Sequence, residues 1–163
     1  MSKVIIIKTG ELAVSHNDDI IKTGSIGSCV VVSLYDSNAR IGGLAHCMLA
    51  KRKTEKNTES INDIGPGNSS AKYVDEAIDC LLASLEKMGG KKESMVAKLV
   101  GGASMFRRLS GDNHGIGWQN VESARKKLAE LRIEIENEDT GGSSGKIAEI
   151  DLRTGILSVN TTL

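Results

Sequence analysis

Cys29 to Asp36 reads CVVVSLYD, Ser37 to Arg40 reads SNAR, and Ile41 to Leu49 reads IGGLAHCML. The first and third segments are apolar and rich in β-branched residues, which favours β-strands. The four residues between them have the composition of a turn. The whole stretch therefore predicts a β-hairpin, and the remaining elements are placed around it.

The register of this hairpin decides which side chains share a face. If its loop has two or four residues, Asp36 faces Ile41 and His46 faces Val31. Cys29 lies two residues from Val31 on the same side of the pleat, so Cys29 and His46 become diagonal neighbours with about 7 Å between their backbones. A three-residue loop would move His46 to the opposite face, so the pairing of these two side chains depends on the turn. In the predicted register Cys47 points to the other side.

Outside the hairpin, the hydrophobic pattern predicts two helices and several strands. Apolar side chains recur at helical spacing over residues 71–88 and 119–132, whereas residues 24–28 and 50–70 are expected to be loops. Two helices are too few to cross over between all the strands, which predicts an α+β fold. We expect one domain over residues 1–163, with largely antiparallel β-sheet layers of seven or eight strands and two main helices on one side. The other candidate strands are 1–7, 11–15, 19–23, 95–101, 133–138, 146–151 and 155–160.

Composition excludes several classes of function. The chain has 21 Lys plus Arg and 21 Asp plus Glu, so no field of one sign attracts nucleic acid or an acidic membrane. Four aromatic residues are too few for a base-stacking platform. The sequence has no long apolar run, which argues against membrane insertion. Three cysteines do not make a disulfide scaffold, and they predict reduced thiols and a cytoplasmic location.

A thiol beside an imidazole has the chemistry of a nucleophile with its base. His46 either takes the proton of Cys29 or holds the thiolate as an ion pair. The small residues Gly27 and Ser28, just before Cys29, leave room for a substrate and can expose backbone N–H groups to an oxyanion. The alternative is a purely structural pair: a buried cysteine in a strand and a histidine satisfied by hydrogen bonds.

A metal site is the less favoured chemistry for these residues. Cys29, His46 and Cys47 would need a fourth ligand, and the chain has no C-x-x-C pair, so we expect no metal and no organic cofactor. Cys80 is expected to pack at the margin of the first helix. His16 and His114 lie in polar turn sequence and are expected to be solvated.

Seven short motifs, in order along nearly the whole chain, resemble the CheD family of chemoreceptor glutamine deamidases. They are Gly27-Ser28-Cys29-Val30, Leu34-Tyr35-Asp36, Gly42-Gly43-Leu44-Ala45-His46, Tyr73 with Asp75 and Ala77, Ala97-Lys98-Leu99-Val100-Gly101-Gly102-Ala103, Ile116-Gly117 with Asn120, and Asp139-Thr140-Gly141-Gly142. The chain departs from the family pattern at Cys47, where an aromatic residue is usual, at Ala50, where a proline is usual, and at 117–120, where the usual loop is more basic.

The resemblance implies an activity and its residues. Members of this family hydrolyse selected glutamine side chains of chemotaxis receptors to glutamate, with a cysteine nucleophile, a histidine base and a threonine that orients the histidine. The matching positions are Cys29, His46 and Thr23. The implied fold is an α/β sandwich like the catalytic domains of some deamidating toxins. The implied partners are the cytoplasmic helices of chemoreceptors and a CheC-type phosphatase, and the alternative function is mainly binding and regulating that phosphatase.

Overall fold

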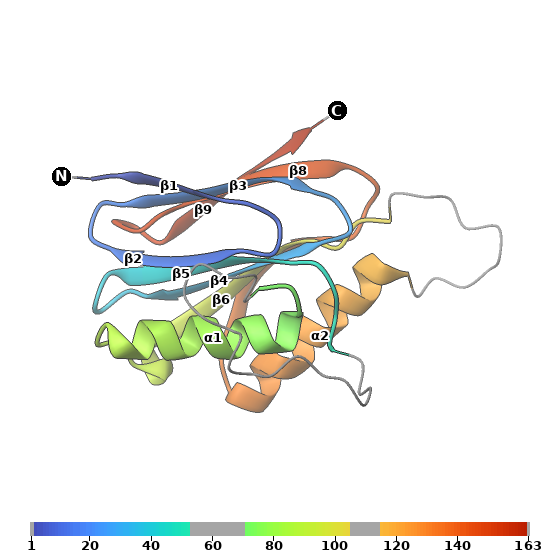
Figure 1. Ribbon diagram of the computed structural model, residues 1–163. Coiled ribbons are helices and arrows are strands. Elements are labelled where there is room, and N and C mark those ends of the chain that lie inside the picture. The colour runs from blue at the N-terminus through green and yellow to red at the C-terminus, as the bar shows by residue number, and fades with distance from the viewer. Residues whose placement is uncertain (1, 53–70, 105–114, 163) are drawn as a thin grey trace.

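The computed structural model describes residues 2–52, 71–104 and 115–162 and has three layers (Figure 1). Two β-sheets are stacked on each other, and both helices cover the outer face of one of them, which is called the second sheet below. The helices are α1 (Val74–Lys87) and α2 (Ile116–Leu131), with a short 3-10 turn, η2 (Lys92–Ser94). The strands are β1 (Val4–Ile7), β2 (Leu12–His16), β3 (Ile20–Ile26), β4 (Val30–Asp36), β5 (Ile41–Cys47), β6 (Met95–Gly101), β7 (Glu134–Thr140), β8 (Gly145–Asp151) and β9 (Ile156–Thr162).

The first sheet has the strand order β1-β3-β8-β9, and the second has the order β2-β5-β4-β6-β7. Only β1 with β3 and β6 with β7 pair in parallel among the described strands, and the other pairings are antiparallel. The predicted α+β class, the largely antiparallel layers and the placement of both helices on one side are confirmed.

Two hydrophobic cores lie on the two faces of the second sheet. One face, with Val32 and Ala45, packs under the helices together with Leu81 of α1 and Leu128 of α2. The other face, with Leu44 in its centre, packs against the first sheet. Every residue of β4 and β5 is buried, because these two central strands are covered on both faces. This accounts for the continuous apolar run of β4, which is typical of a strand that is buried on both sides.

Some boundaries differ from those that the sequence predicted. The described residues form nine strands, one in each of the nine candidate segments, so the expected total of seven or eight was too low. β3 continues to Ile26, although residues 24–28 were expected to be a loop, because a bulge between Thr23 and Ile26 lets the strand keep pairing with β8. α2 begins at Ile116, three residues before the expected start. Most of the loop expected at 50–70 and the turn with His114 lie outside the described residues.

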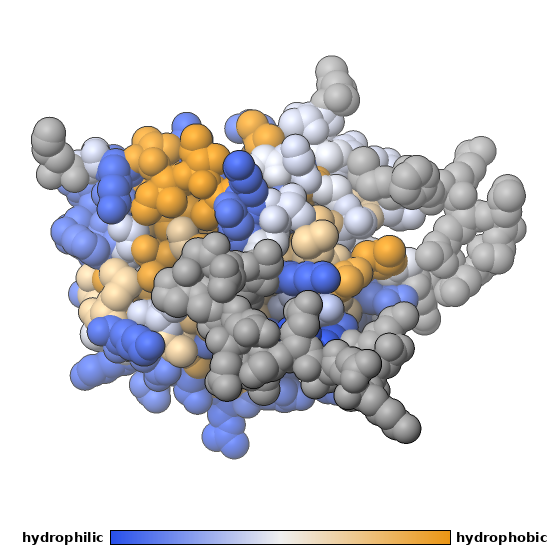
Figure 2. Space-filling view, viewed as in Figure 1, coloured by the Kyte–Doolittle hydropathy of each residue, from blue (hydrophilic) through white to orange (hydrophobic). Residues whose placement is uncertain are grey.

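The outer surfaces of the layers differ in character. Figure 2 shows apolar side chains gathered where β1 and β2 lie, above a mostly hydrophilic helix layer. The β1 side chains Val4 and Ile6 are exposed on the first sheet. Within the described part of the chain, no helix is both long enough and apolar enough to cross a membrane.

Candidate active site

The hairpin has the register that the sequence predicted. β4 and β5 are joined through a four-residue turn, and Val31 is paired with His46. Cys47 is buried in the core under the helices, as the sequence predicted. Cys29 immediately precedes β4, two residues from Val31, and alternation along the strand predicts it as the diagonal neighbour of His46 on the face toward the first sheet. Its placement beside His46 stays a prediction.

Thr23 reaches His46 from the opposite layer. It lies on β3 of the first sheet, and its side chain points into the space between the sheets, where it is buried. Its Oγ1 lies 2.7 Å from Nδ1 of His46 and 2.9 Å from the carbonyl oxygen of Ile7. The structure thus brings the threonine and the histidine together, although they are 23 residues apart in the chain.

This arrangement assigns the tautomer of His46. A carbonyl oxygen can only accept, so the single hydroxyl proton of Thr23 is donated to Ile7. The hydroxyl oxygen must then accept from His46, which places the neutral imidazole proton on Nδ1. Nε2 is left with a free lone pair, and it has no hydrogen-bond partner among the described residues. An unpartnered buried nitrogen of this kind can accept a proton from a nearby thiol.

Burial keeps both the histidine and the cysteine neutral. His46 is completely buried, and its desolvation lowers its pKa from 6.5 to about 4. Cys29 is half-buried, and desolvation raises the pKa of its thiol, partly offset by a backbone hydrogen bond. Both shifts favour the neutral thiol and imidazole over the thiolate–imidazolium pair. Of the two possibilities that the sequence left open, the electrostatics favour a proton transfer that accompanies attack.

The segment that carries Cys29 is held by the end of β6. The carbonyl oxygens of Gly27 and Cys29 accept hydrogen bonds from the backbone of Ala103 and Gly102, at 3.0 and 2.7 Å. Gly101 has a φ of 110°, and a Cβ there would overlap the Cys29 carbonyl oxygen. Gly27 and Ser28 lie between β3 and β4, as the sequence predicted, and both are half-buried.

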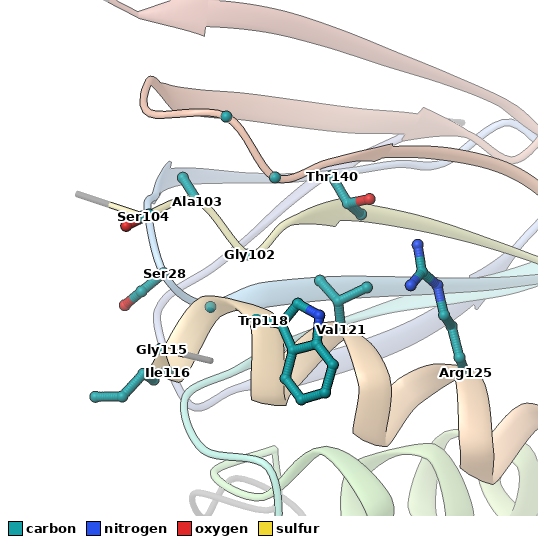
Figure 3. A pocket seen from close by; sticks show the side chains of 13 residues that line it. Ser28, Gly102, Ala103, Ser104, Gly115, Ile116, Trp118, Val121, Arg125 and Thr140 are labelled. Carbon is teal, nitrogen blue, oxygen red and sulfur yellow. The ribbon is translucent and has the colours of Figure 1, made fainter. Parts of the chain in front are cut away.

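A pocket of about 440 Å³ opens beside the nucleophile segment (Figure 3). Ser28 lines it, whereas Cys29 and His46 do not. Trp118 and Val121 of α2 form one wall, and the ends of β6 and β7 form the other. Its cation, Arg125, is hydrogen-bonded to Glu138 at 2.8 Å and to Glu122. Through Ser28, the pocket adjoins the segment that carries Cys29.

The other chemistry considered from the sequence finds little support. No group of three or more His, Cys, Asp or Glu side chains in the described ranges could hold a metal ion. Cys80 is half-buried on α1, and His16 is exposed at the end of β2, as expected for packing and solvated residues. No individual role was predicted for Asn120, which lies fully buried beside the site. Its place within the resemblance was the only signal.

The fold and the site define a two-sheet α+β protein with a buried imidazole that is held by a threonine between its layers. The family model described as CheD chemotactic sensory transduction matches residues 48–161. The chain is 41% identical over 162 residues, covering 99% of this chain and 95% of the relative, to a protein of Halalkalibacterium halodurans named "Chemoreceptor glutamine deamidase CheD". It is 37% identical over 155 residues, 95% of this chain and 90% of the relative, to the "Probable chemoreceptor glutamine deamidase CheD" of Pyrococcus abyssi.

The chain belongs to the CheD family. The family model begins after His46, but the alignment with the Halalkalibacterium protein covers nearly the full length of both chains. The resemblance found in the sequence motifs is therefore confirmed.

Proposed function

We propose that this protein is a chemoreceptor glutamine deamidase in which Cys29 is the nucleophile, His46 the base and Thr23 the residue that orients His46. One observation carries the proposal. The bond from His46 Nδ1 to Thr23 leaves Nε2 without a partner among the described residues, and the strand register predicts Cys29 on the same face of the hairpin. The printed names of the full-length relatives supply the substrate class.

The reaction follows from these groups. As the Cys29 sulfur attacks the Cδ carbon of a substrate glutamine, its proton passes to Nε2 of His46. The resulting oxyanion is stabilised by backbone N–H groups of the Gly27–Cys29 segment. His46 returns the proton to the amide nitrogen, which leaves as ammonia and yields a thioester. Water then gives a proton to Nε2 and attacks the thioester, which releases glutamate and restores the thiol.

Exposed apolar side chains offer a docking surface for the receptor helices that the family resemblance implies. Met48 and Leu49 follow β5 directly, and Ile116 and Trp118 lie in the first turn of α2. All four are more than a third exposed, although they are large and apolar. A helix with an apolar stripe fits such a surface.

The same surface is our proposed docking site for a CheC-type phosphatase, the partner that the resemblance implies. Pull-down with the Cys29→Ala variant separates this binding from catalysis, because docking needs the surface and not the thiol.

The activity is tested with a receptor cytoplasmic fragment. Incubation with the wild-type protein should raise the mass of specific glutamine-containing peptides by the small increment that distinguishes an acid from an amide. The Cys29→Ala variant should leave these peptides unchanged, because no thioester can form. Equal conversion by both proteins would contradict the role of Cys29, and no conversion by either would contradict the proposed activity.

The pH dependence of the reaction should have a low acidic limit. Burial holds the pKa of His46 at about 4, so the imidazole stays a neutral base well below pH 6.5 and is lost only near pH 4. The measurement is kcat/KM between pH 3.5 and 8, with circular dichroism to confirm that the protein is folded. In the unfolded chain His46 binds a proton below about pH 6.5, whereas in the folded protein it stays neutral down to about pH 4. The free energy of unfolding therefore falls as the pH is lowered from 6.5 to 4. An acidic limit near 6.5 in folded protein would contradict this prediction.

Replacing Thr23 with valine should lower kcat/KM by about 10- to 100-fold. Valine keeps the size of the side chain but removes the acceptor of the Nδ1 proton, so the imidazole loses its fixed orientation and tautomer. Thr23→Ser is the matched control, because it restores the hydroxyl and should recover most of the activity. Steady-state kinetics of both variants check the prediction, and an equal loss in both would contradict it, because restoring the hydroxyl would then recover nothing.

A further inference from the structure

Asn120 joins the two segments that carry the candidate nucleophile and base. Its Nδ2 donates to the carbonyl oxygen of Ser28 at 2.9 Å and to that of Met48 at 3.0 Å. Ser28 directly precedes Cys29, and Met48 lies two residues after His46. One amide group therefore uses both of its N–H donors to hold the ends of the two strands together.

The amide of Asn120 is buried at a cost. Its side chain has no exposed surface, and its Oδ1 has no hydrogen-bond partner among the described residues. A buried acceptor without a partner is unfavourable by about 1–3 kcal/mol. An apolar side chain at position 120 would avoid this cost. What asparagine adds, compared with an apolar residue, is the two hydrogen bonds that it donates to Ser28 and Met48.

Close backbone packing brings Asn120 to this place. The first turn of α2 lies against the end of β6, where a Cβ on Gly117 would be 2.5 Å from the Ala103 carbonyl oxygen. A Cβ on Gly102 would overlap Val121 and lie 2.9 Å from the Gly117 carbonyl oxygen. With glycine at both positions, the start of α2 packs close enough to the end of β6 for Asn120 to reach the carbonyl oxygens of Ser28 and Met48.

The β4–β5 ladder joins the two segments as far as the pair Val30 and Cys47, and beyond that pair the two strand ends are anchored to different parts of the fold. The carbonyls on either side of Ser28 are held by the end of β6. The backbone N–H groups of Met48 and Leu49 donate to the carbonyl of Lys72, just before α1. Both of these contacts would remain if Asn120 were changed, but they do not connect the two segments to each other.

We propose that Asn120 is a positioning residue that fixes the separation of Cys29 from His46. The inference rests on the proposed thiol–imidazole mechanism, since the separation matters only if a proton passes between these two groups. A displacement of about 1 Å between reacting groups can lower a rate by about 100-fold. The loss should fall on kcat, because Asn120 is buried and does not contact the substrate.

Two variants and one control test this role. Asn120→Asp keeps the size and loses the two donors, and Asn120→Ala removes the side chain in case the aspartate variant fails to fold. Ser123→Ala is the control, because Ser123 lies one turn further along α2 and donates to the Ala50 carbonyl at 2.7 Å without reaching the nucleophile segment. Circular dichroism and thermal unfolding establish that each protein is folded before its kinetics are measured.

The first readout is deamidation. In folded Asn120 variants we expect kcat to fall by about 10- to 100-fold with KM within about 2-fold of the wild type. The control Ser123→Ala should keep kcat within about 2-fold. Wild-type kcat in a folded Asn120 variant, or an equal loss in the control, would overturn the proposal.

The second readout does not depend on the receptor. Iodoacetamide alkylation at neutral pH is followed by peptide mass spectrometry, with Cys80 of the same chain as the internal reference. The ratio of the Cys29 rate to the Cys80 rate should fall in the Asn120 variants to that of His46→Ala, and Ser123→Ala should keep the wild-type ratio. A wild-type ratio in the Asn120 variants would overturn the positioning role. If the wild type does not deamidate the receptor fragment but the alkylation ratios change as expected, the proposed activity is rejected and the positioning role of Asn120 is supported.

Discussion

His46→Ala should abolish measurable deamidation, with kcat reduced by about 10³-fold or more. The reason is the buried Nε2, which has no hydrogen-bond partner in the described part of the chain and is our proposed base for Cys29. With the thiol pKa raised by desolvation, almost no thiolate forms at neutral pH unless a neighbouring group accepts its proton. Steady-state kinetics on the receptor fragment measure the loss, and circular dichroism shows whether the folded state survives the lost side chain.

His16→Ala provides the matched control for this substitution. His16 is exposed at the end of β2, so its removal should leave the rate unchanged. The double variant Cys29→Ala with His46→Ala should be no slower than Cys29→Ala alone, because the two groups act as one unit. Additive losses would contradict a shared proton transfer.

Gly101→Ala should be the most destabilising of these substitutions, by about 4 kcal/mol. Gly101 has a φ of 110°, which L side chains rarely adopt, and its new Cβ would overlap the Cys29 carbonyl and lie 2.7 Å from Ile26 Cγ2. The strain is relieved only by moving the backbone of the nucleophile segment. Urea or thermal unfolding measures the change, and the folded fraction should also lose activity because Cys29 is displaced.

Gly89→Ala separates the cost of backbone strain at a positive φ from the cost of steric overlap. Gly89 follows α1 with a similar φ of 98°, but a Cβ there meets nothing within 4 Å. Its cost should be about 1–2 kcal/mol, from backbone strain alone. If both variants lose the same stability, overlap with the nucleophile segment contributes nothing.

The hairpin shows how much of the site the sequence could predict. A loop of two or four residues predicts the pairing of Val31 with His46, which the structure has, and the same register predicts Cys29 on the face of His46 and Cys47 on the other. Such local inference works because strand pairing across a short turn has few possible registers. The end of β3 could not be predicted in this way. Gly24 and Ser25 have weak strand propensity, and only their place beside β8 in the first sheet extends the strand to Ile26.

Thr23 and Asn120 mark the limit of that inference. Thr23 could be assigned beside His46 only through a family resemblance, because it lies on the other sheet and β3 pairs with neither strand of the hairpin. Asn120 lies 92 residues from Ser28 and 72 from Met48 along the chain. By itself, the sequence determined most of the elements, the class of fold and the register of one hairpin, from which the pairing of a thiol with an imidazole is predicted. The stacking of the layers decided which groups orient the imidazole, exclude water from it and hold the two strand ends together, since such contacts depend on packing between segments that are distant in the chain.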